Sequence, residues 1–321
     1  MSRFSFALSA PQPPDVAVEI GAHAVTALNL SAAGTRSTVV AFASEALPPG
    51  ALVPALTAAN VVDRAAVSAA LARVLERVGG ARRLGLVIPD AVARVSLVRF
   101  QDVPQKTQDL EQLIRWQVRK AAPFPIEEAQ VSFVRGGKSA EGQEFVVSLA
   151  RRDVVAEYEA LCAGAGAHAG LVDLSTFNVI NTVLASEGPA LGDWLLVNVA
   201  ADWTSVAILR GADLIFFRSR GAEGDVTLAD LVHQTAMYYE DRLGGSRLGR
   251  VMLCGASTAD PRQAAEVEWL RRSLEERLGT TAEAVDPRKA AALPEGMAPT
   301  PALLDALAPM IGLLVREKDA A

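Results

Sequence analysis

The most informative feature of this chain is a short pattern that occurs twice. Two apolar runs separated by a turn of small residues span Val16–Leu30, and the same arrangement recurs at Leu195–Leu209. A third strand-like run follows each pair, at Ser37–Ser44 and at Asp213–Arg218. One copy would be an ordinary hairpin. Two copies predict two related half-molecules, each built on a meander of three strands.

The spacing of the two copies puts their turns in equivalent positions. Asn198 aligns with Glu19 at an offset of 179 residues. The turns Gly21–His23 and Ala200–Asp202 should then both point into a cleft shared by the two halves. Ligands usually bind in clefts between domains, so we expect an α/β fold whose candidate site is formed by these turns.

Length and charge exclude several classes of protein. A chain of 321 residues of which half are apolar is expected to form two or more domains. The net charge of −6 argues against a nucleic-acid-binding protein. Cys162 and Cys254 do not make a disulfide framework, which fits a reducing compartment. No apolar run approaches the roughly 20 residues that span a bilayer, so direct membrane insertion is not expected.

The middle of the first half has a different character. Helical spacing over Asp63–Val78 and a buried strand at Leu84–Ile88 are followed by a strand, a helix capped by Thr107, and two further strands. This segment predicts a small α+β module inserted into the first half. The expected divisions are a flexible tail at 1–15, a first domain at 16–90 plus 151–190, the inserted module at 91–150, and a second domain at 191–321.

One segment of the inserted module is specific enough to suggest a family. Asp109–Glu128 combines an acidic helix start, Trp116, a Pro-Phe-Pro sequence at 123–125 and an acidic end. The two meanders and the strand–glycine element at Arg250–Ala256 resemble the actin/Hsp70/sugar-kinase fold. Asp109–Glu128 itself resembles the inserted-domain motif of the PilM family, the actin-like cytoplasmic proteins of type IV pilus assembly. Similarity extends from about residue 15 to about residue 316.

This resemblance implies a fold and a role. The fold is a pair of actin-like (ribonuclease H-like) domains that face a cleft, and the inserted module is like that of FtsA. The role is a cytoplasmic scaffold at the inner membrane that binds the N-terminal tail of a PilN-like single-pass membrane protein. The tail groove would lie between the first domain and the module, with Trp116, Phe124 and Pro125 as partner-binding residues. Pilus motor ATPases are further expected partners.

Most relatives also bind ATP, which makes ATP and Mg²⁺ possible cofactors. The corresponding positions in this chain are Glu19, Gly21, Ala22, His23, Asn198, Ala200, Asp202, Gly255 and Ala256. In such a site, hydroxyls and backbone N–H groups of the first turn hold phosphates, and carboxylates of both turns orient the metal.

Three departures from that pattern predict a degenerate nucleotide site. The first turn has the longer Glu19 and no hydroxyl at Ala22. The second has the neutral Asn198 in place of a carboxylate, and Ala200 where glycine would permit a positive φ. The adenosine turn carries Ala256 in place of its second glycine. We therefore expect weak nucleotide binding or none, and no catalytic residue.

Other functions remain open at this stage. A sugar-kinase phosphotransferase would need a base and intact phosphate turns. An FtsA-type cytoskeletal protein usually ends in a basic membrane helix, and a type II secretion relative continues into a transmembrane helix; this chain ends at Arg316–Ala321 with neither. No hydrolase triad or zinc site is evident from the spacing of the histidines, cysteines and aspartates.

Overall fold

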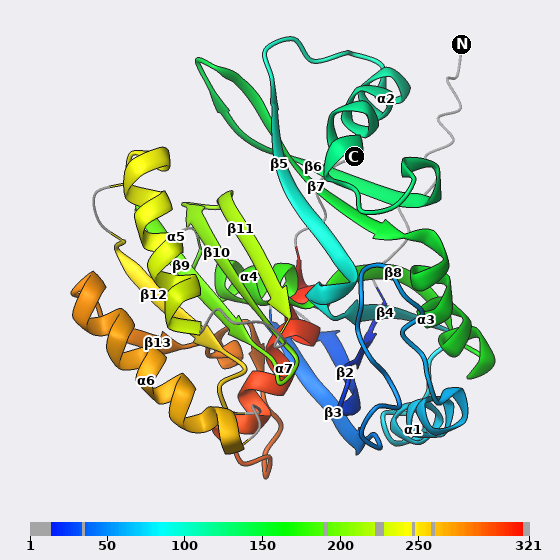
Figure 1. Ribbon diagram of the computed structural model, residues 1–321. Helices are drawn as coiled ribbons and strands as arrows, with labels where there is room; N and C mark the ends of the chain where they lie inside the picture. The colour runs from blue at the N-terminus through cyan, green and yellow to red at the C-terminus, as the bar shows by residue number, and fades with distance from the viewer. Residues whose placement is uncertain are drawn as a thin grey trace, which may run out of the picture.

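The computed structural model describes residues 14–33, 36–188, 192–221, 228–245, 248–257 and 261–316. Nearly all of the predicted tail, residues 1–13, lies outside this part of the chain. The described residues form two α/β halves side by side, with a smaller module above them (Figure 1). Within these ranges, no helix combines the length and the apolar character needed to cross a membrane.

The first half is built on one mixed sheet with the strand order β14-β3-β2-β1-β4-β8. The strands β1, β2 and β3 form the predicted antiparallel meander, and β4 and β8 extend it in parallel. Helices α1 and α3 cover one face, and the side chain of Asp63, the first residue of the predicted helix, is the N-cap of α1. The elements are β1 (Val16–Ile20), β2 (Ala24–Ala33), β3 (Arg36–Ala46), α1 (Arg64–Arg77), β4 (Arg83–Ile88), α3 (Arg152–Gly164), β8 (His168–Leu174) and β14 (Ala291–Ala292).

The second half repeats this topology with the order β11-β10-β9-β12-β13. Again a three-stranded antiparallel meander is followed by two strands parallel to its first member. Helices α5 and α6 cover the outer face. The elements are β9 (Asp193–Val199), β10 (Trp203–Arg210), β11 (Asp213–Gly221), α5 (Leu228–Leu243), β12 (Arg250–Cys254), α6 (Pro261–Leu278) and β13 (Ala282–Ala284). The shared strand order supports the duplication expected from the sequence.

Two helices lie between the sheets and tie the halves together. Helix α4 (Ser175–Glu187) packs on the second sheet, where Val179 and Val183 contact Trp194 and its neighbours. Helix α7 (Pro301–Val315) belongs to the second half in sequence but packs on the first sheet through residues such as Ile311. The short strand β14 also joins the first sheet, beside β3. Each half of the chain therefore completes the core of the other.

The inserted module is a three-stranded sheet with the order β5-β7-β6 and one helix. It consists of β5 (Ala93–Phe100), α2 (Thr107–Val118), β6 (Ala129–Ser139) and β7 (Gly142–Arg151), with 3₁₀ turns at η1 (Asp90–Val92), η2 (Arg119–Ala121), η3 (Ile126–Glu128) and, outside the module, η4 (Pro287–Lys289). The expected N-cap of α2 was displaced by one residue, since Thr107 is the first helical residue and Lys106 is the cap.

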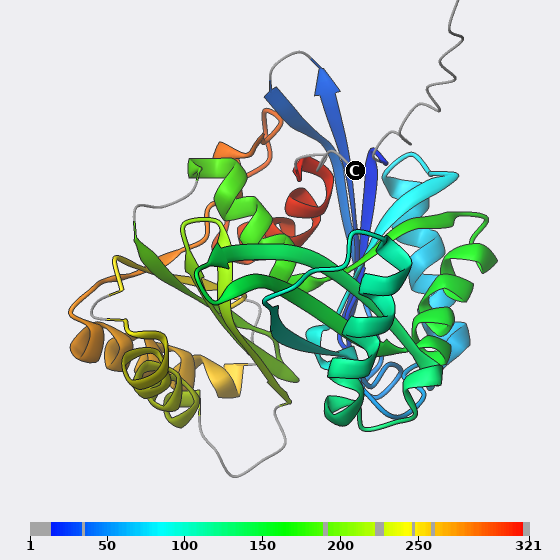
Figure 2. The same cartoon turned by 90° about the horizontal axis from the view of Figure 1, so that it is seen from above.

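The module contacts both halves. One face of its sheet is covered by α2, whose buried Ile114 packs in a cluster with Phe145. The other face places Val95, Leu97 and Val146 in one apolar cluster with Phe217 of β11. Figure 2 shows the module in front of the boundary between the halves. Movement of one half against the other would therefore also disturb the module.

Candidate functional site

The two predicted turns are closed by the same backbone hydrogen bond. The Gly21 N–H donates to the Ala24 oxygen at 3.0 Å, and the Ala200 N–H donates to the Trp203 oxygen at 2.8 Å. The donors Gly21 and Ala200, and likewise the acceptors Ala24 and Trp203, are separated by the same 179 residues as Glu19 and Asn198. Burial raises the pKa of Asp202 in the second turn, and a backbone hydrogen bond and the nearby His23 of the first turn oppose this rise, so the two turns lie near each other.

Glu19 lies at the end of β1, just before the first turn. It is partly buried, and its Oε1 accepts a hydrogen bond from Ser175 Oγ at 3.1 Å. Removal from water raises the pKa of Glu19 to about 7, the Ser175 hydrogen bond opposes this, and the nearby charge of Asp90 adds to it. Compared with an ordinary glutamate, Glu19 therefore favours the neutral form up to a much higher pH.

Asn198 occupies the equivalent position in β9, and its amide is already used. It is buried, and its Nδ2 donates to Thr176 Oγ1 at 2.9 Å. Thr176 is the second residue of α4, so the Asn198 amide contacts the helix that connects the two halves. Because a neutral amide held in this way supplies no charge, Asn198 is poorly suited to orient a hydrated metal ion.

A third turn, after β12, completes the edge of the site. Gly255 has φ +78°, and a Cβ there would lie 2.0 Å from the Val199 oxygen, so only glycine fits. The next residue, Ala256, is partly exposed. The following Ser257 donates its N–H to the Asp305 carboxylate of α7 at 2.9 Å. Burial raises the pKa of Cys254 at the end of β12, and the charges of Asp305 and Glu19 add to this rise, so Cys254 lies near both carboxylates.

Ala200 adopts no left-handed backbone. Among the described residues, every positive φ belongs to a glycine. The second turn is therefore built with ordinary backbone angles, in keeping with the expectation that alanine resists the conformation glycine would allow.

Sequence reasoning missed the carboxylates at the carboxyl ends of β4 and β8. Asp90 is fully buried at the first residue of η1, and it accepts hydrogen bonds from Thr176 and Ser205. Asp173, next to the end of β8, has its pKa raised to about 6, mainly by burial, while Arg316 Nη1 lies 3.4 Å from its Oδ2. Polar residues that end parallel strands gather at one sheet edge, and this signal would have identified them.

The residues predicted to bind a partner lie on the module, away from these turns. Trp116 on α2 is 66% exposed, the largest exposed fraction of any tryptophan in the described ranges. Phe124 is partly buried and packs against the module core, and Pro125 is exposed and precedes η3. Trp116 is therefore not a core residue, whereas Phe124 partly is.

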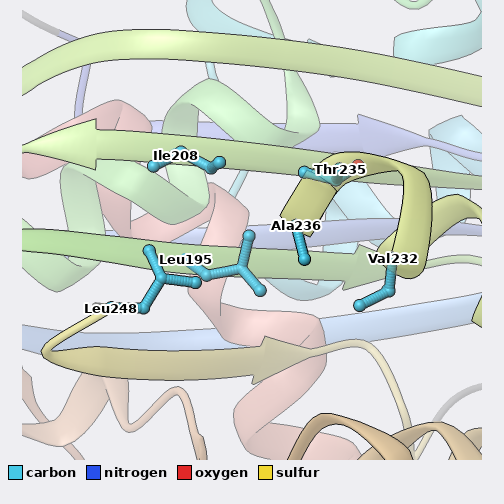
Figure 3. Close-up of a pocket in the computed structure, with 6 residues that line it drawn as sticks. All are labelled: Leu195, Ile208, Val232, Thr235, Ala236 and Leu248. Atoms are coloured by element: carbon cyan, nitrogen blue, oxygen red, sulfur yellow. The ribbon is translucent and has the colours of Figure 1, made fainter. Parts of the chain in front are cut away.

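Two other features offer no polar site. Within the described ranges, no three or more histidine, cysteine, aspartate or glutamate residues are placed to hold a metal ion. A small hollow lies between β9, β10 and α5 (Figure 3), and its lining is almost entirely apolar. Leu195 lines it and alternates with Leu196 along β9, so the hollow lies on the sheet face opposite Asn198.

Comparison with known proteins gives consistent matches. The family model described as "Type IV pilus assembly protein PilM" matches residues 17–242. A solved "PilM-PilN type IV pilus biogenesis complex" matches with a TM-score of 0.73 and 21% identity, covering 95% of this chain and 97% of that chain. This match confirms the expected fold of duplicated actin-like domains with an inserted module.

More distant structures were also found. A protein of unknown function with an actin-like ATPase fold from Bacteroides thetaiotaomicron has a TM-score of 0.49 at 9% identity, covering 84% of this chain and 89% of that chain. The cytoplasmic domain of EpsL, an inner-membrane component of the type II secretion system of Vibrio cholerae, has a TM-score of 0.44 at 12% identity, covering 74% and 79%.

Proposed function

This chain belongs to the PilM family of type IV pilus assembly proteins, and from that premise we propose that it is a scaffold which binds the N-terminal tail of a PilN-like membrane protein. The similar solved structure is named as a PilM-PilN complex, which supports a PilN-like partner. Through that partner the protein would be held at the inner membrane. Contact with pilus motor ATPases stays a prediction.

The observation that carries this proposal is the exposure of Trp116. Helix α2 already uses Leu110, Ile114 and Val118 to cover the module sheet. Trp116 lies outside that buried set and is 66% exposed. Exposed tryptophans that become buried in a complex are among the strongest contributors to binding. The Phe124-Pro125 segment follows the end of the same helix and supplies further apolar surface.

We predict that Trp116→Ala weakens binding of the tail by roughly tenfold or more, because a buried aromatic anchor contributes more than about 1.4 kcal/mol. The measurement is fluorescence anisotropy with a labelled synthetic peptide, the N-terminal tail of the PilN-like protein. Circular dichroism checks that the variant is folded.

Trp269→Ala is the matched control. Trp269 lies on α6 of the second half and is likewise exposed, at 52%. Its replacement therefore removes a similar aromatic surface far from the module. It should leave the affinity unchanged. Equal affinities for the wild type and Trp116→Ala would place the tail elsewhere, and no detectable peptide binding by the wild type would refute the proposed function.

We also propose that the nucleotide site is degenerate in this member of the family. Glu19 is partly neutral at neutral pH, and the Asn198 amide is engaged with Thr176. Charge-assisted contacts are the strong ones in phosphate and metal binding. These two side chains therefore offer little charge to a phosphate-bound Mg²⁺, because one is held by an internal hydrogen bond and the other favours its neutral form.

Titration calorimetry with Mg-ATP tests this directly. We expect no micromolar binding, and we expect the affinity for the tail peptide to be the same with and without Mg-ATP. Micromolar binding of Mg-ATP by the wild-type protein would contradict the proposal and favour the alternative of a nucleotide-binding ATPase.

A further inference from the structure

We infer that Asp90 is a latch between the two halves, which holds them in one arrangement without a nucleotide. Asp90 is the first residue of η1, where the chain leaves β4 and enters the inserted module. Its side chain is fully buried. A carboxylate in that position needs several hydrogen-bond donors, and the structure supplies them from outside the first sheet.

The donors come from two elements. The Thr176 N–H donates to Asp90 Oδ1 at 3.1 Å, and the Thr176 hydroxyl donates to Oδ2. Ser205 Oγ in β10 donates to the same Oδ2 at 2.5 Å. Ser205 belongs to the second sheet and Thr176 to the connecting helix α4. One carboxylate therefore joins the first half directly to the second.

A second path reinforces the first. The Asn198 amide donates to Thr176 Oγ1, so that hydroxyl must give its own proton to Asp90. Asn198 and Ser205 are direct cross-strand partners of β9 and β10, and they lie on the same face of the second sheet. Two neighbouring side chains of the second half therefore hold Asp90. Ser205 does so directly, and Asn198 does so through Thr176.

The surroundings favour the joined arrangement. Phe177, the residue after Thr176, packs on Phe217 of β11 with ring centroids 5.4 Å apart, in the cluster that includes module residue Val95. Separating the halves would expose this apolar cluster and leave Asp90 without its donor from β10. Both changes are unfavourable.

In an arrangement joined through a ligand, the contacts between halves depend on that ligand being present. Here the Asp90 carboxylate and its neutral donors Thr176 and Ser205 make the contacts internally, so the relative position of the halves does not depend on nucleotide. This inference does not rest on tail binding, which concerns a different surface.

Spin-label distance measurements test the latch. Nitroxide labels are attached at Ala72→Cys on α1 and Glu276→Cys on α6, both exposed, while the native Cys162 and Cys254 are buried. For the otherwise wild-type chain we expect one narrow distance distribution that Mg-ATP does not change. Asp90→Asn and the milder Ser205→Ala should each broaden it or add a longer distance.

Thr204→Ala is the matched control, because Thr204 is the neighbour of Ser205 on β10 and its side chain lies on the opposite face. It should leave the distribution narrow. If Ser205→Ala lowers the thermal stability but keeps the wild-type distribution, the hydrogen bond is merely structural and the inference is wrong. A shift of the wild-type distribution by Mg-ATP would also overturn it.

Discussion

Replacing Gly312 by alanine is expected to destabilise the protein by about 3 kcal/mol, at the upper end of the usual effect of overpacking. Gly312 lies in α7 where that helix crosses α4. A Cβ at this position would lie 1.7 Å from the Asn178 oxygen and 2.7 Å from Thr182 Oγ1. Because the nearest of these atoms is backbone, the two helices must separate. The measurement is the free energy of unfolding in urea.

The sign of this effect is opposite to that of helix propensity. Alanine is favoured over glycine inside a helix by about 1 kcal/mol, so the contact with α4 must outweigh that gain. Gly164→Ala is the control, since Gly164 is also helical and nothing lies within 4 Å of its added Cβ. It should be neutral or slightly stabilising. If Gly312→Ala behaved like Gly164→Ala, the close helix crossing would be refuted.

Glu19→Gln is expected to stabilise the protein at pH 8 by up to about 3.5 kcal/mol and to have little effect at pH 4. The amide keeps an oxygen that can accept the Ser175 hydrogen bond, but it removes the charge that burial disfavours. The upper bound follows from a pKa near 7 in the folded protein against 4.5 when unfolded, at about 1.4 kcal/mol per unit. Residual contact of Glu19 with solvent makes the effect smaller.

The direction with pH follows from linkage. Since the folded pKa of Glu19 is raised, its contribution to stability is complete below pH 4.5, is lost as the pH rises toward 7, and stays lost above that. The difference between variant and wild type should therefore grow across this window. Other groups that titrate there, such as Asp173, are present in both proteins and cancel.

Urea unfolding at intervals between pH 4 and pH 8, without nucleotide, measures this difference. Glu276→Gln, an exposed glutamate of α6, controls for the loss of one charge at the surface. A difference between Glu19→Gln and the wild type that does not change with pH, or a loss of stability at pH 8, would contradict the prediction.

Much of the fold could be predicted from local patterns. The two meanders were visible because their strands are apolar at nearly every position and end at turns of small residues. Their equivalence was visible as a fixed offset, and the structure shows the same turn hydrogen bond at Gly21 and Ala200. The inserted module was evident from a change of pattern after Asp90. Trp116 of that module is exposed, and its role in partner binding stays a prediction.

The candidate site was predicted less completely. Glu19 and Asn198 were found through the repeat and the family motif, but Asp90, Thr176 and Ser205 were not. Each of these three is ordinary in its own segment, since Asp90 follows a strand, Thr176 starts a helix and Ser205 sits within a strand. They form a network only because segments 86 and 29 residues apart in sequence meet in space.

By itself, the sequence determined the strands, the turns and the pairing of equivalent halves, because these depend on side-chain periodicity and turn chemistry over a few residues. Only the tertiary structure decided that α7 packs on the first sheet and that Gly312 allows its close contact with α4. The same holds for the hydrogen bond from Ser205 to Asp90. Such contacts depend on the packing of elements far apart in the chain. No local pattern encodes which buried polar group will find its donors in the opposite half.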